Sequence, residues 1–163
     1  MNVNFINPVL GSILNVLSTM AHIKPTVGTP RRKDKNDIVR GKNITGVMSM
    51  VGKRGNASIA LTFSEAVILH IAEEMLPGEI TTIDGMVIDL VGELANMVLG
   101  GAKSDLEKEG YFFQLSLPTI IFGSDYLIAQ KTNAPIIMLA FTMPEGEFFV
   151  EAGYEERDIN SYI

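Results

Sequence analysis

The chain has 163 residues, no cysteine, and a formal net charge of −6 at pH 7. A chain of this length buries roughly two thirds of its unfolded surface, so we expect one domain over residues 1–163. The absence of cysteine excludes disulfide bonds as a source of stability. The acidic balance argues against general binding to nucleic acids or anionic membranes, because both need clustered lysine and arginine.

Signals for export or membrane insertion are weak. The first 16 residues contain an apolar stretch with no positive charge ahead of it, which argues against a secretory signal. No apolar stretch approaches the roughly 18–20 residues that a membrane-spanning helix needs. We therefore expect a soluble, cytoplasmic protein with no membrane partner.

The first predicted element is a helix over about residues 8–22. Asn7 supplies an N-cap acceptor, Pro8 takes the first helical position, and apolar residues recur behind it at helical spacing. Pro25, Gly28 and Pro30 then open a polar connection.

That connection, residues 25–42, is rich in basic side chains. They are Arg31, Arg32, Lys33, Lys35, Arg40 and Lys42. Asp34 and Asp37 interrupt the positive charge, and no aromatic residue is interleaved for base stacking. The pattern favours a solvated loop over a functional basic patch.

A β-hairpin and a second helix follow. Residues 44–51 and 56–63 alternate in part between apolar and small polar side chains, and the turn-like GKRG joins them. Ser64 is the expected N-cap of a helix that continues to Leu76. His70 in this helix is interpreted as a core or boundary residue, because the sequence offers no accompanying ligand set for zinc.

The third helix has the strongest apolar periodicity. It is expected to begin near Thr81 or Thr82, where Thr81-x-x-Asp84 resembles a capping box. Gly100-Gly101 interrupts the pattern, residues 102–110 add a further helical turn or two, and a glycine ends that piece.

The C-terminal part is predicted as sheet. Its strands are expected at about residues 112–122, with Pro118 inside, and at 126–130, 135–143 and 147–154. The order helix, two strands, two helices, and then about three strands (α-β-β-α-α-β-β-β) predicts an α+β fold. In this fold a mostly antiparallel sheet packs against helices.

The third helix carries a polar stripe. Asp89, Glu93 and Asn96 stand at positions i, i+4 and i+7, so they share one face. Such a face is ordinarily just the solvated side of an amphipathic helix, although asparagine costs roughly 0.5 kcal/mol of helix propensity relative to alanine. The two carboxylates are close enough for acid/base chemistry, but nothing in the sequence supplies a nucleophile or metal site beside them.

The glycine pair beyond this stripe has two interpretations. Gly100 and Gly101 either end the helix or leave the stripe open to the close approach of another protein's backbone. If the helix continues through them, Lys103 joins the stripe seven residues after Asn96. A phosphate loop is excluded, because that motif needs a glycine directly before the lysine and a strand before the loop.

The spacing Asp89-x3-Glu93-x2-Asn96, followed 22 residues after the asparagine by Pro118, resembles the signature of the CheC/CheX/FliY family of response-regulator phosphatases. The surrounding NMVLGGAKSDLEKEGYFFQLSLPT resembles the CheX branch, and ITGVMSMVGKRGNASIALTF resembles the first hairpin of that family. The resemblance covers most of the chain. It implies a CheC-like fold and hydrolysis of the aspartyl phosphate on a CheY-like receiver domain, in chemotaxis or related two-component signalling.

The resemblance also implies roles for the residues. Asn96 would orient the attacking water and Glu93 would dock against the receiver's active-site lysine, with Asp89 supporting that contact. Pro118 would shape the backbone near the asparagine, and Gly100 and Lys103 would belong to the partner-binding face. Any Mg²⁺ would sit on the receiver, leaving this chain with no cofactor of its own, and CheX-branch proteins pair as homodimers through the sheet.

A second copy of the site is not expected on the first helix. That helix offers Asn15, but Ser12 stands where a glutamate would be needed, and no proline follows at position 37 or 38. We therefore predict one site per chain.

Two other functions remain open. A non-catalytic receiver-binding or flagellar-switch-like adaptor would keep the fold without turnover. A small-molecule-binding domain has no supporting pocket signal in the sequence.

Overall fold

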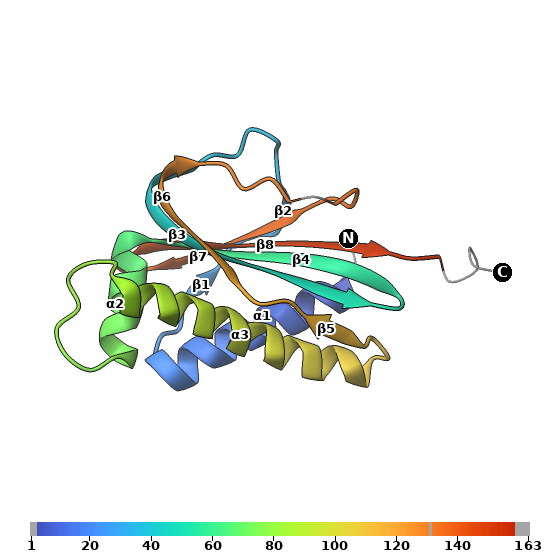
Figure 1. Ribbon diagram of the computed structural model, residues 1–163, viewed down its shortest axis with the longest axis horizontal. Helices are drawn as coiled ribbons and strands as arrows, with labels where there is room; N and C mark the ends of the chain where they lie inside the picture. The colour runs from blue at the N-terminus through green and yellow to red at the C-terminus, as the bar shows by residue number, and fades with distance from the viewer. Residues whose placement is uncertain (1–2, 131, 159–163) are drawn as a thin grey trace.

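A computed structural model describes residues 3–130 and 132–158, in which helices cover one face of an antiparallel sheet (Figure 1). The helices are α1 (Val3–Ala21), α2 (Glu65–Met75) and α3 (Gly85–Lys108). The strands are β1 (Thr26–Val27), β2 (Arg31–Arg32), β3 (Val39–Gly52), β4 (Gly55–Ser64), β5 (Phe113–Leu115), β6 (Thr119–Tyr126), β7 (Ile137–Met143) and β8 (Gly146–Glu156). The predicted α+β class is confirmed.

Two hairpins form the centre of the sheet. Its order is β1-β7-β8-β4-β3-β5, with β2 also paired to β7 and β6 to β3, and every pair is antiparallel. The β3–β4 hairpin is the one predicted from the sequence, and it is longer at both ends. Because successive side chains in a strand alternate between faces, one face of these hairpins meets the helices.

The core lies between the sheet and the helices. Phe5 of α1 stacks on Tyr154 of β8 with ring centroids 5.2 Å apart, and meets the edge of Phe113 at 6.2 Å. On β3, Ile44 and Met48 are fully buried toward the helices. A continuous apolar layer therefore fixes both long helices on the sheet.

Helix α1 begins five residues earlier than predicted. It starts at Val3, and Pro8 lies inside it rather than at its first turn. Phe5 and Ile6 are buried in the core, so their packing makes the first turn helical. The prediction that Asn7 caps the helix is wrong for this reason.

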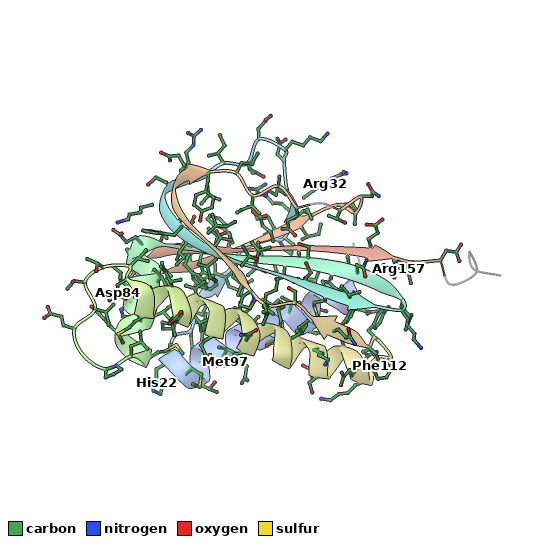
Figure 2. The ribbon with its side chains drawn as sticks, viewed as in Figure 1. His22, Arg32, Asp84, Met97, Phe112 and Arg157 are labelled. Atoms are coloured by element: carbon green, nitrogen blue, oxygen red, sulfur yellow. The ribbon has the colours of Figure 1, made fainter. Side chains whose placement is uncertain are left out.

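Helix α3 begins at a different cap and is longer than predicted. Asp84 is its N-cap, since one carboxylate oxygen accepts hydrogen bonds from the backbone N–H groups of Met86 at 3.0 Å and Val87 at 3.1 Å. The predicted capping box starting at Thr81 is wrong. The helix then runs unbroken to Lys108, as Figure 2 shows between Asp84 and Phe112, so the glycine pair does not end it.

The sequence prediction that no apolar stretch is long enough to span a membrane is corrected by α3. Its composition and length suit a membrane span, with a mean hydropathy of 1.3 over the best 18-residue window. Half of that window is buried inside the structure, as in the core helix of a soluble protein. The apolar residues of α3 are accounted for by packing against the sheet and α1.

The C-terminal strands differ from the prediction in two places. The stretch predicted as one strand over 112–122 is divided, because β5 ends at Leu115 and β6 begins at Thr119. Residues 127–130 form no strand, so the one predicted at 126–130 is wrong. The strands predicted at 135–143 and 147–154 correspond to β7 and β8.

The basic segment is only partly a solvated loop. It contains β1 and β2, and the side chain of Lys33 is buried, with its Nζ 2.7 Å from Glu151 Oε2 and 2.5 Å from the carbonyl oxygen of Ile128. Arg31 is exposed and pairs with Asp37 at 2.7 Å, and this hydrogen bond lowers the pKa of the Asp37 carboxyl. Lys33 therefore ties the segment to β8.

Helices α1 and α3 run in opposite directions and approach closely (Figure 1). Ser12 Oγ donates a hydrogen bond to the carbonyl oxygen of Val98 at 2.6 Å, and a Cβ atom on Gly101 would overlap that hydroxyl group. A Cβ atom at position 100, in contrast, would meet no atom within 4 Å. Gly101 therefore permits the close approach of α1 to α3, whereas Gly100 is not required for helix packing.

This difference gives a stability prediction. Gly101→Ala is expected to lower the free energy of unfolding by about 1–2 kcal/mol, because overpacking outweighs the gain in helix propensity. Gly100→Ala, the matched control, should raise it by up to about 1 kcal/mol. Adding Ser12→Ala to Gly101→Ala removes the overlapping hydroxyl group and should recover part of the loss. Equal effects of the two glycine substitutions in urea denaturation would contradict this account.

Candidate active site

The polar stripe of α3 lies on the side of the helix that faces away from the core. Asp89, Glu93 and Asn96 are exposed, whereas Val91 and Leu94 are buried. This is the expected result of a 3.6-residue period on a helix with one face against the sheet.

The three polar side chains of the stripe have no partner within the part of the chain that the structure describes. No hydrogen bond or ion pair involves the side chain of Asp89, Glu93 or Asn96 in residues 3–130 and 132–158. Their backbone belongs to a continuous helix packed on two sides, so the side chains stand on a rigid support. A rigid row of free acceptors and one free amide is suited to contact with another molecule.

Pro118 packs beside the stripe. A Cβ atom at Gly92 would lie 3.5 Å from Pro118 Cγ, so the proline ring contacts the helix one turn before Asn96. Pro118 occupies the break between β5 and β6, where its missing N–H interrupts no strand pairing. The structure thus brings together the proline and the helix that the sequence motif linked.

The segment that carries Pro118 is anchored to β3. The N–H of Ser116 donates to the carbonyl oxygen of Ser49 at 2.8 Å, and Ser116 Oγ accepts from the N–H of Ser49 at 2.9 Å. Between these anchors and Pro118 lies Leu117, whose side chain is 88% exposed. The sequence reasoning missed Leu117, although its place directly before the motif proline was a usable signal.

Gly100 and Lys103 extend the stripe toward the C-terminal end of α3. Gly100 is exposed with open space around it, which leaves Asn96 unshielded one turn away. Lys103 is half-buried, and its Nζ lies 3.7 Å from Glu107 Oε1 on the next turn. Lys103 therefore lies on the predicted face but is paired with Glu107.

The carboxylates of the stripe do not form a metal centre in the structure. In residues 3–130 and 132–158, no three His, Cys, Asp or Glu side chains are grouped to hold a metal ion. The functional groups at this surface are the carboxamide of Asn96, the carboxylates of Asp89 and Glu93, and the exposed backbone at Gly100.

Comparisons with known proteins show the family of the chain. The family model for the chemotaxis phosphatase CheX matches residues 44–142, which include the whole stripe and Pro118. The chain belongs to the CheX family of chemotaxis phosphatases. The resemblance seen in the sequence is thereby confirmed, and so is the enzyme class, because phosphatases are hydrolases.

Individual CheX relatives cover nearly the full chain. The CheY-P phosphatase CheX of Thermotoga maritima is 25% identical over 152 residues, which are 91% of this chain and 94% of that protein. A CheC-like superfamily protein from a Shewanella species (PV-4) is 41% identical, with a TM-score of 0.88 over 95% of this chain and 99% of that one. A chain of the CheX–CheY–BeF3–Mg²⁺ complex from Borrelia burgdorferi shares the fold at 22% identity, with a TM-score of 0.75 and coverage of 94% and 98%.

Proposed function

We propose that this chain dephosphorylates the aspartyl phosphate of a CheY-like receiver domain, in chemotaxis or a related two-component pathway of the cytoplasm. The observation that carries the proposal is the exposed pair of Glu93 and Asn96, both unpartnered within residues 3–130 and 132–158, on a rigid helix. The names of the Thermotoga relative and of the Borrelia complex, which concern CheY and its phosphate, support the same substrate class.

Asn96 is the group that orients the attacking water. Phosphoryl transfer needs positioning and charge stabilisation more than covalent help from the protein. A neutral carboxamide holds the water in line with the phosphorus without adding negative charge beside the phosphoryl oxygens. A carboxylate at this position would repel them, which explains why the stripe presents an amide at this point.

Glu93 is the docking group. Its exposed carboxylate accepts a charge-assisted hydrogen bond from the receiver's active-site lysine, which fixes the register of the two proteins. Asp89, one turn back on the same face, adds negative charge beside that contact. Pro118 holds the edge of the contact surface against Gly92.

The proposal places Mg²⁺ on the receiver. The Borrelia complex holds CheY together with BeF3 and Mg²⁺, and BeF3 there stands in for the phosphoryl group. This chain supplies the amide and the docking carboxylate, while the receiver's own metal supplies charge neutralisation at the phosphoryl oxygens.

The direct test is phosphate release from a phosphorylated receiver of the same organism. Adding this protein should raise the release rate well above the receiver's own rate, with multiple turnovers per chain. Binding of the receiver without faster release would establish the adaptor function in place of the phosphatase. Absence of both would reject the proposed partner.

Replacing Glu93 by glutamine should weaken docking more than chemistry. Loss of one charge-assisted hydrogen bond of about 1.5–3 kcal/mol should raise the Kd for a BeF3-activated receiver by roughly 10-fold to 100-fold. The value of kcat at saturating receiver should fall much less. Isothermal titration calorimetry and steady-state kinetics separate the two effects. Glu73→Gln, an exposed change on α2, is the matched control, and an equal loss in both variants would contradict the docking role.

The same proposal includes pairing of two chains through the sheet, which the family resemblance implies. Val51 and Leu127, each about half exposed, line one hollow on the sheet, whose other lining includes Ser58 and Ile121. Size-exclusion chromatography with light scattering should give twice the mass of one chain. A Leu127→Glu variant should shift the equilibrium to the monomer, and a wild-type monomer at micromolar concentration would reject this part.

A further inference from the structure

Leu117 is the most exposed large apolar side chain in residues 3–130 and 132–158. It is 88% exposed, whereas Phe112 follows at 68% and the other exposed large apolar side chains lie between 43% and 49%. A single exposed leucine is common on protein surfaces and by itself indicates no function. The exposure of Leu117 gains significance from its position beside the polar stripe of α3.

Leu117 lies at the edge of this stripe. A Cβ atom at Gly92 would lie 3.5 Å from Pro118 Cγ, so the proline ring touches α3 one residue before Glu93. Gly92 and Asn96 are four residues apart, which separates them by only about 40° around the helix axis. The peptide bond between Leu117 and Pro118 is trans, so their Cα atoms are about 3.8 Å apart. Leu117 therefore stands beside the face that carries the two site residues.

The backbone of Leu117 is held on both sides. Before it, the N–H of Ser116 donates to the carbonyl oxygen of Ser49 at 2.8 Å, and Ser116 Oγ accepts from the N–H of Ser49 at 2.9 Å. The same hydroxyl group donates to the carbonyl oxygen of Leu117 at 3.0 Å. After it, Pro118 restricts the backbone of the preceding residue to extended conformations. The side chain is thus presented on an ordered segment, and little backbone entropy is lost when a partner covers it.

The proposed reaction brings a partner close to Leu117. Asn96 can hold a water in line with the phosphorus only if the stripe enters the phosphorylation site of the receiver, with reacting atoms about 3–3.5 Å apart. The receiver surface around that site then meets the segment next to Asn96. Covering an apolar side chain that otherwise stands in water stabilises the complex in proportion to the apolar area removed from water.

We infer that Leu117 is an apolar anchor for the receiver domain, and that it selects receivers with an apolar surface beside the phosphorylated aspartate. This inference rests on the proposed function of the α3 face. Glu93 supplies the charged part of the contact, which salt screens, whereas Leu117 supplies a part that salt does not screen. A receiver with a charged side chain opposite Leu117 is bound weakly, because that charge loses water without gaining a partner.

A polar substitution of similar size tests the anchor. Leu117→Asn is expected to raise the Kd for a BeF3-activated receiver of the same organism by roughly 10-fold to 100-fold. The value of kcat at saturating receiver should stay close to wild type, because Asn96 is intact. Leu117→Met keeps the side chain apolar and should retain most of the affinity. Because position 117 is exposed, both variants should unfold at the wild-type urea concentration.

A matched control and a change of salt separate this contact from others. Ile38, 43% exposed, belongs to the connection between β2 and β3, which lies on the face of the sheet opposite the helices (Figure 1). Ile38→Asn should leave the Kd unchanged. Raising the salt from about 0.1 M to about 1 M shortens the Debye length from about 10 Å to about 3 Å. The fold-loss caused by Leu117→Asn should persist at high salt, whereas the fold-loss caused by Glu93→Gln should shrink.

A single thiol gives a readout that does not depend on catalysis. The chain has no cysteine, so Leu117→Cys introduces a unique reactive group. With the BeF3-activated receiver at about ten times its Kd for this variant, alkylation of the thiol should slow roughly tenfold. Mass spectrometry of this chain measures the rate. A thiol introduced by Ile38→Cys should react at the same rate with and without the receiver.

The outcomes distinguish this inference from the proposed function. An active wild-type chain whose Kd is unchanged by Leu117→Asn overturns the inference alone, and so does a thiol at position 117 that stays fully reactive in the complex. A shift from dimer to monomer in Leu117→Asn, with unchanged affinity for the receiver, assigns the side chain to contact between two copies and also overturns it. Binding without turnover by the wild-type chain, lost in Leu117→Asn, leaves the anchor standing and rejects the proposed catalysis. Failure of the wild-type chain to bind a receiver rejects both.

Discussion

Asn96→Ala is expected to lower kcat for the phosphorylated receiver roughly 100-fold or more, a loss of about 3 kcal/mol in transition-state stabilisation. The methyl group cannot hold the attacking water in line, while Glu93 still docks the receiver. Because the Asn96 side chain is exposed and makes no hydrogen bond to a described residue, its truncation should leave the free energy of unfolding nearly unchanged. Phosphate release under single-turnover conditions separates this chemical effect from binding.

Two further variants sharpen that test. Asn96→Asp keeps the shape but adds a negative charge, and it should be at least as damaging as alanine because the carboxylate repels the phosphoryl oxygens. Asn15→Ala removes an exposed asparagine of α1, outside the polar stripe of α3, and should retain wild-type kcat. Turnover by Asn96→Ala equal to wild type would reject the water-positioning role.

The exposed polar stripe of α3 could be predicted from sequence because its geometry is local. Asp89, Glu93 and Asn96 lie within three helical turns, and a helix puts such positions on one face whatever the rest of the chain does. The apolar residues between them predict which face is buried. The contact of Pro118 with Gly92 joins segments that are distant in the sequence. Periodicity could not predict this contact, whereas the resemblance to the family indicated that the proline lies near the helix.

The failures have a common physical origin in contacts between distant segments. The first turn of α1 is helical because Phe5 packs against Tyr154, which overrides the local start signal at Asn7 and Pro8. The glycine pair does not end α3, because Gly101 is required for the approach of Ser12. In both cases, local start and stop signals predicted a helix boundary that tertiary packing shifts.

The basic segment provides the second large predicted effect. Lys33→Ala is expected to lower the free energy of unfolding by about 3–5 kcal/mol, because it leaves the Glu151 carboxylate buried without its cation. Glu151 is 1% exposed, and among residues 3–130 and 132–158 the only side chain besides Lys33 that donates to its carboxylate is Gln130, at 3.1 Å. Sequence reasoning treated this lysine as solvated, since its partner lies 118 residues away. Chemical denaturation with urea measures the loss.

A control and a rescue test whether burial is the cause. Arg31→Ala breaks an exposed ion pair in the same segment and should cost at most about 1 kcal/mol. Lys33→Met combined with Glu151→Leu removes both buried charges and should recover most of the lost stability, because the desolvation penalty disappears with the charges. A loss with Lys33→Ala as small as that with Arg31→Ala would contradict a stabilising role for the buried Lys33–Glu151 pair.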